Sequence, residues 1–129
     1  MSFTLKQAGA ACAFAALAMI GVDASAARIK VTCEVRPSRS TISVDGKDLA
    51  AGSYSSVAVS GGNMASTLPE AAVAGEVETD YSSRPADIKA GATAIASTFI
   101  VGASVTGKIV DATGHTVISD TVACRVRNK

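Results

Sequence analysis

Cys33 and Cys124 are the residues whose chemistry this sequence indicates most clearly. A third cysteine, Cys12, lies in an apolar N-terminal segment that we expect to be removed, so the other two remain as an even pair. In an exported protein such a pair predicts a disulfide bond. The bridge would close a loop of about 90 residues. In the chain-entropy model, closing a loop of this length stabilises the folded protein by on the order of 4–5 kcal/mol. That is comparable to the whole net stability of a small domain.

The expectation of export comes from residues 1–26. An apolar run from Ala8 to Val22 follows a single basic residue, Lys6, and Ala24-Ser25-Ala26 has the small residues that a signal peptidase needs. We therefore expect a cleaved signal peptide over 1–26 and a single domain over 27–129, located in the periplasm or secreted. The run is shorter than the ~20 apolar residues that span a bilayer, so we expect no stable membrane insertion after cleavage.

His115 is the only histidine, and Asp111 precedes it by one turn of chain, so the two side chains could pair across that turn and respond to pH. A catalytic triad also needs a nucleophile beside the histidine, and the neighbouring sequence contains none. One histidine and two bridged cysteines cannot supply the four ligands of a structural zinc site. We find neither a phosphate-binding glycine loop nor a GxSxG motif. We therefore expect no enzyme, no cofactor and no metal site.

Three carboxylates, Glu76, Glu78 and Asp80, alternate along one segment and would share one strand face. Such a face could bind Ca²⁺ or a basic partner. Alternate strand residues lie nearly 7 Å apart, however, which is too far for all three to hold one ion. A solvated face, or charge that protects a sheet edge from aggregation, is the other interpretation.

The remaining candidate contacts are basic or aromatic. Arg125 and Arg127 would converge with other basic residues if the terminal strands pair, with Glu34 neutralising part of the patch. Tyr54 is out of phase with Ser55, Val57 and Val59, so we expect an exposed ring. The complete set of candidate partner contacts is Tyr54, Glu76, Glu78, Asp80, Asp111, His115, Arg125 and Arg127.

The elements that must position these residues are strands, because the segment after residue 26 has 13 Val, 7 Ile and 10 Thr but 2 Leu. Arg28–Arg36 alternates with period two, placing Ile29, Val31, Cys33 and Val35 on one face. The segment from Val122 to Arg127 repeats the pattern as a second strand, with Val122, Cys124 and Val126 together. The two cysteine strands are either neighbours in one sheet or face each other across two.

Further strands are predicted between these two. We expect a turn at Asp45-Gly46, a strand over Ser53–Val59 that ends at Gly61-Gly62, and a strand from Glu76 to Ser82 with Val77, Thr79 and Tyr81 inward. Ile95–Val101 is predicted as a buried central strand. A hairpin is predicted from Val105 to Val126, with a β-bulge or a strand end near Ser119-Asp120 that returns Asp120 to water. Pro85–Gly91 is predicted as a short helix, and Met64–Gly75 as a loop or a short helix.

These elements indicate an all-β fold, a small antiparallel β-sandwich of seven or eight strands with immunoglobulin-like architecture. A net charge of +1 argues against nucleic acid as the partner. We expect an exported module that acts by protein–protein interaction, or as a structural or accessory subunit of the bacterial envelope, through a strand edge or end loops. The alternatives are a small inhibitor or immunity-type protein that binds one enzyme, and a weak Ca²⁺- or ligand-binding domain.

Overall fold

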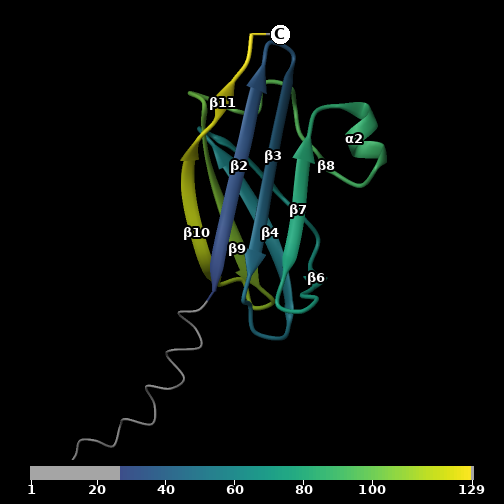
Figure 1. Ribbon diagram of the computed structural model, residues 1–129, viewed down its shortest axis with the longest axis vertical. Helices are drawn as coiled ribbons and strands as arrows, with labels where there is room; N and C mark the ends of the chain where they lie inside the picture. The colour runs from purple at the N-terminus through teal and green to yellow at the C-terminus, as the bar shows by residue number, and fades with distance from the viewer. Residues whose placement is uncertain (1–26, 129) are drawn as a thin grey trace, which may run out of the picture.

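The computed structural model describes residues 27–128, so the predicted signal peptide lies outside the described residues. Two five-stranded sheets form a sandwich-like all-β fold (Figure 1). We call the sheet with strand order β11-β2-β3-β7-β8 the front sheet, and the sheet β10-β9-β4-β5, with β6 also paired to β4, the back sheet. The strands are β2 (Arg28–Arg36), β3 (Arg39–Lys47), β4 (Ser53–Ser60), β5 (Asn63–Ser66), β6 (Glu70–Ala71), β7 (Val77–Ser82), β8 (Thr93–Ala94), β9 (Ser104–Asp111), β10 (Thr116–Ala123) and β11 (Arg125–Val126).

The hairpin of β2 and β3 forms the middle of the front sheet. The prediction for β2 is confirmed, since the strand runs from Arg28 to Arg36 before the turn. The predicted turn at Asp45-Gly46 is wrong, because both residues pair within β3 and the strand continues to Lys47. Gly46 instead faces the core, where an added Cβ would lie 3.1 Å from Ile109 Cγ1 of the back sheet and would require that side chain to move slightly.

β4 exists where it was predicted but presents the opposite face to the core. Tyr54, Ser56, Ala58 and Ser60 are its buried residues. Tyr54 is 6% exposed, and its hydroxyl donates a hydrogen bond to the Ala50 carbonyl at 2.6 Å. The expectation of an exposed Tyr54 ring is therefore wrong. The valines of β4 suggested the other face, whereas serines can be buried when their hydroxyls find partners.

β7 and α2 match their predictions. Val77, Thr79 and Tyr81 are buried along β7 while Glu78 and Asp80 are exposed. The helix α2 (Pro85–Lys89) has proline in its first turn, where the missing N–H has no helical partner to lose.

The segment 95–101 is not the predicted central strand. It is a loop with one isolated bridge, although Phe99 and Ile100 are buried in it. The residues 64–75 contain the short strands β5 and β6 rather than a helix.

The β9–β10 hairpin is confirmed, with Gly114 at a φ of 91° in its turn. The bulge lies between Thr116 and Ile118, so the predicted position at Ser119-Asp120 is wrong. Because the bulge precedes Ile118, it brings Ile118 and Val122 into register with the inward residues Ile109 and Val105. Asp120 stays in the same phase as these two.

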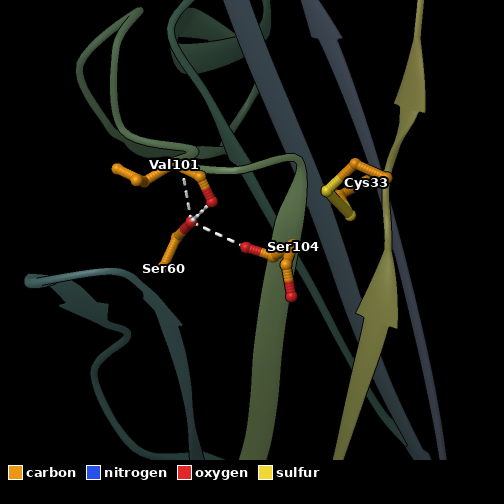
Figure 2. Close-up of a disulfide and its surroundings, with 5 residues drawn as sticks. Cys33, Ser60, Val101 and Ser104 are labelled. Carbon is orange, nitrogen blue, oxygen red and sulfur yellow. Dashed lines mark hydrogen bonds between the residues drawn. A yellow bond between two sulfur atoms is a disulfide. The ribbon is translucent and has the colours of Figure 1, made fainter.

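The C-terminal residues form two strands in two sheets, so the prediction of a single strand through Cys124 is wrong. β10 ends at Ala123 in the back sheet, and β11 pairs in parallel with β2 of the front sheet, with Arg125 opposite Glu34. Cys124 lies at the crossing and is bonded to Cys33, with a Cα–Cα distance of 4.7 Å (Figure 2). The predicted disulfide is confirmed. Val126, which was predicted to face the core, is 60% exposed because it lies beyond the crossing.

The core lies between the two sheets and includes hydroxyl groups. Thr79 donates to the Val44 carbonyl at 2.9 Å, so Ser56 of the back sheet must donate to Thr79 at 2.7 Å. The remaining contact, Tyr81 to Ser56 at 2.5 Å, then has the tyrosine as donor. Burial raises the pKa of Tyr81. The chain of hydroxyls is a polar link between the sheets.

The Ser60 hydroxyl, which is separate from this chain of hydroxyls, fixes the loop before β9. The Val101 N–H donates to Ser60 Oγ at 2.7 Å, and Ser60 Oγ donates to the Ser104 carbonyl at 2.7 Å (Figure 2). Ser60 is 2% exposed. Its partners explain why a serine can occupy this buried position, since a buried hydroxyl without them would be costly.

Candidate functional site

The outward face of the front sheet contains a hollow of about 670 Å³. Its floor comes from adjacent strands, because Thr32 pairs with Ser43, and Ser43 pairs with Asp80. The helix side contributes Asp87 and Ala92, and the β11 side contributes Arg125. The hollow is therefore lined by hydroxyl and charged groups together with apolar residues such as Ala92 and Ala123.

The basic end of this face is partly neutralised by Glu34. Its carboxylate accepts contacts from Arg36 Nε and from Arg127 Nε, both at 2.9 Å. The sequence prediction that Glu34 would offset converging basic residues is confirmed for these two. Arg127 reaches Glu34 because the pairing of β11 with β2 places it there; its N–H also donates to the Val35 carbonyl at 2.9 Å.

The acidic end of the face gathers Asp45, Glu78 and Asp80. Asp45 pairs directly with Glu78 across β3 and β7. Burial raises the pKa of Asp45, and the negative charges of Glu78 and Asp80 raise it further, while Lys30 acts in the opposite direction. Glu76 lies just before β7 and is not part of the strand pairing that holds the other two. Among the described residues, no group of three histidine, cysteine or acidic side chains is arranged to hold a metal ion.

The β9–β10 turn holds Asp111 and His115 at its surface. Asp111 Oδ1 accepts hydrogen bonds from the His115 N–H at 3.0 Å and the Thr113 hydroxyl at 2.7 Å. These bonds, the one from the Thr113 hydroxyl above all, lower the pKa of Asp111. The His115 ring contacts Thr113 rather than the carboxylate, with 2.8 Å between Nδ1 and the hydroxyl. Asp111 and His115 thus pair across the turn through the backbone and Thr113, which is the arrangement of a stabilised turn.

Exposed apolar side chains lie along the edge of the back sheet that is opposite to β10. Met64 is 72% exposed, Leu68 85% and Val73 76%. We call this segment, residues 64–73, the apolar edge. It runs antiparallel to β4, which pairs with both β5 and β6, and it bulges outward between them at Leu68 and Pro69.

The apolar edge is anchored on both sides of its bulge. The Thr67 N–H donates to the Ser56 carbonyl at 3.0 Å, and the Ala72 N–H donates to the Gly52 carbonyl at 2.9 Å. The backbone is therefore fixed while the Leu68 side chain projects into solvent. The sequence showed this segment only as a loop or short helix. The signal that could have found it is Leu68 itself, one of two leucines after residue 26 and placed beside Pro69.

The predicted contact residues thus divide among several places. The front face has Glu78 and Asp80 at its acidic end and Arg125 and Arg127 at its basic end, and the β9–β10 turn holds Asp111 and His115. Tyr54 is in the core and Glu76 lies apart. Within residues 27–128, no helix has the length and hydrophobicity that a membrane crossing requires.

Comparisons with protein-family models, with curated proteins and with solved structures find no match to this chain.

Proposed function

We propose that this protein is an exported, non-enzymatic β-sandwich module that binds another secreted or envelope protein through its apolar edge. The observation that carries the proposal is the exposure of Met64, Leu68 and Val73, which are 72%, 85% and 76% exposed within ten residues of chain. Exposed apolar side chains that follow one another along a sheet edge of a small protein can mark a surface that a partner covers. A leucine on a fixed backbone also loses little entropy on binding, which favours its use as an anchor.

The disulfide supports the exported part of this proposal. Bonds such as Cys33–Cys124 persist in oxidising compartments and are rare in the cytosol. The predicted signal peptide over residues 1–26 is consistent with the same destination.

The test is affinity purification of the mature protein, residues 27–129, from an envelope extract under oxidising conditions. We expect a defined partner to be recovered by the wild-type chain and lost with Leu68→Asp. The matched control is Val126→Asp, since Val126 is also an exposed apolar residue, 60% exposed, but lies on β11 of the front sheet. Equal recovery by wild type and Leu68→Asp would contradict the apolar edge as the contact.

A small inhibitor that binds one enzyme is the second candidate, and the projecting Leu68 bulge is the feature that favours it. An inhibitor needs a fixed, protruding segment, and the bulge is held on both sides by hydrogen bonds to β4 and its preceding turn. The two candidates differ in their partner. Titration of the recovered partner with the wild-type protein should abolish an enzymatic activity at a 1:1 ratio if the protein is an inhibitor, and leave any activity unchanged if it is an accessory subunit.

A further inference from the structure

β10 is the longest strand at an edge of either sheet in the described chain. It has eight residues and, among the described strands, pairs only with β9, so its other backbone edge has no partner strand. In the front sheet, the edge strands β8 and β11 have two residues each, and β11 leaves only residues 28–33 of β2 without a partner on that side. The edge opposite β10 is interrupted between β5 and β6 at Leu68 and Pro69. A long open edge is the usual template for pairing with another chain, so β10 is the edge that most needs protection.

The inward side of β10 would favour such pairing if it were apolar throughout. Ile118 pairs with Ile109 and Val122 pairs with Val105, both of which are buried inward residues of β9. Ile118 and Val122 are half-buried and pack against the core. A strand added beside them would extend the same apolar layer.

Asp120 interrupts this layer at its centre. It pairs with Gly107, so its side chain emerges on the same inward side as Ile118 and Val122. The space above Gly107 is filled from the front sheet, since a Cβ at that glycine would lie 2.6 Å from Val31 Cγ2. Asp120 therefore turns to the open side of the sandwich and is exposed. Its Oδ1 accepts a hydrogen bond from the Thr121 N–H at 3.0 Å, which satisfies one backbone donor within the strand itself.

We infer that Asp120 is a gatekeeper that prevents β10 from pairing with the β10 strand of a second copy of this chain. A strand added to this edge would cover the carboxylate on its remaining open side, between two apolar side chains, and burying an unpaired charge is strongly unfavourable. In an antiparallel twofold pair centred on Asp120, the two carboxylates would also lie opposite each other, which is destabilising in a sheet. The bulge at Val117 adds to the protection by breaking the regular spacing of the edge.

The inference is independent of the proposed function, because it concerns the opposite edge of the back sheet from Leu68. It also assigns a role to a charge that is in phase with core residues and that the bulge does not return to the outward face. Removing the charge should uncover an edge whose flanking side chains are already apolar.

The test is Asp120→Val in the oxidised mature protein, followed by sedimentation velocity over a range of concentrations. We expect the variant to self-associate at least tenfold more tightly than wild type, and the β10 amides to become protected from hydrogen exchange in the associated form. Ser119→Val is the matched control, since Ser119 lies on the same strand but pairs with the outward Lys108. It should remain as monomeric as wild type. Asp120→Lys keeps a charge at position 120 of β10 and should also remain monomeric.

Four results would overturn the inference. They are a folded Asp120→Val that stays monomeric, equal association by Ser119→Val, association by Asp120→Lys, and a wild-type protein that already pairs through β10. If Asp120→Val does not fold, Asp120→Asn has nearly the same shape without the charge. Self-association of folded Asp120→Asn beyond that of wild type then supports the gatekeeper, and a strictly monomeric Asp120→Asn rejects it.

Discussion

The outward faces of the two sheets differ in chemistry more than in shape. On the front sheet, strands β2, β3 and β7 present charged and hydroxyl residues outward, and several of these residues line the hollow. On the back sheet, the outward positions of β4, β9 and β10 within the described residues are uncharged except for Lys108. The other outward positions that pair between these strands hold Ser55, Val57, Val59, Thr106, Val110, Ser119 and Thr121.

The two outward faces also differ in whether their side chains have partners within the protein. Glu34, Arg36 and Arg127 on the front face satisfy one another at 2.9 Å. Thr106 and Thr121 on the back face hydrogen-bond to each other at 2.6 Å, but Leu68 at its edge contacts mainly solvent. The front face thus resembles a solvated surface, whereas the apolar edge of the back sheet is the part that gains most from a partner.

The largest effect is expected from breaking the covalent connection between the two sheets. Cys33→Ser with Cys124→Ser removes the bond at the point where the chain passes from the back sheet to β11. Loss of the long loop constraint should lower the free energy of unfolding by about 4–5 kcal/mol, measured by urea denaturation. Wild-type protein unfolded in a reductant should match the double variant, and an unchanged urea midpoint would contradict this account.

The next largest effect is expected where the sheets approach most closely. Gly107→Ala places a Cβ 2.6 Å from Val31 Cγ2, so either the Val31 side chain or one of the strands must shift. We expect a loss of about 2 kcal/mol of unfolding free energy from overpacking. Gly62→Ala is the control, since a Cβ there meets nothing within 4 Å; thermal unfolding of both variants should separate them. Equal midpoints would mean that the sheets are less tightly opposed than described.

A smaller effect is expected from the polar link between the sheets. Ser56→Ala removes the acceptor of the Tyr81 hydroxyl and the donor to Thr79 at once. Because Tyr81 is 1% exposed, its hydroxyl would remain buried without that acceptor, at a cost of about 1 kcal/mol. The double variant Ser56→Ala, Tyr81→Phe has no tyrosine hydroxyl left to bury. Adding Tyr81→Phe to the Ser56→Ala variant should therefore lower the free energy of unfolding by less than Tyr81→Phe lowers it in the wild-type protein. Additive costs in a double-mutant cycle would refute the coupling.

The smallest effect is expected on the front face alone. The pKa of Asp45 is raised in the folded protein, which means that folding favours the protonated form of this carboxyl. The protonated carboxyl therefore contributes to stability at pH values below the ordinary carboxyl pKa, and this contribution is lost as pH rises through the raised pKa. Asp45→Asn should therefore stabilise the protein at neutral pH by on the order of 0.5 kcal/mol, kept small by solvent screening. At pH 3, where the native carboxyl is protonated, the gain should vanish. A Lys108→Gln control on the back face should show no such difference between the two pH values.

The sequence predicted those strands whose inward residues are apolar. β2 and β7 follow a period of two in valine, isoleucine and aromatic residues, and both were assigned to the correct face. β4 was assigned to the wrong face because its buried side includes Ser56 and Ser60, whose partners lie far along the chain. Such hydrogen bonds cannot be inferred from local alternation.

The candidate site was less accessible to prediction for a similar reason. The apolar edge depends on pairing between residues 63–72 and β4, and the bulge at Leu68 appears only when both short strands are placed. The disulfide could be predicted from cysteine count, but the crossing of the chain at Cys124 could not. Apolar alternation continues through Val122, Cys124 and Val126 and hides the change of sheet.

The position of the disulfide has a mechanical consequence. β2 begins at one end of the molecule and the C-terminus lies at the other (Figure 1). Tension applied between the two ends would pass along residues 28–33, through the sulfur atoms, and out along residues 124–128. The loop from residue 34 to residue 123, which contains most of both sheets, would carry almost none of that load. The domain could thus be stretched between two attachment points without unravelling.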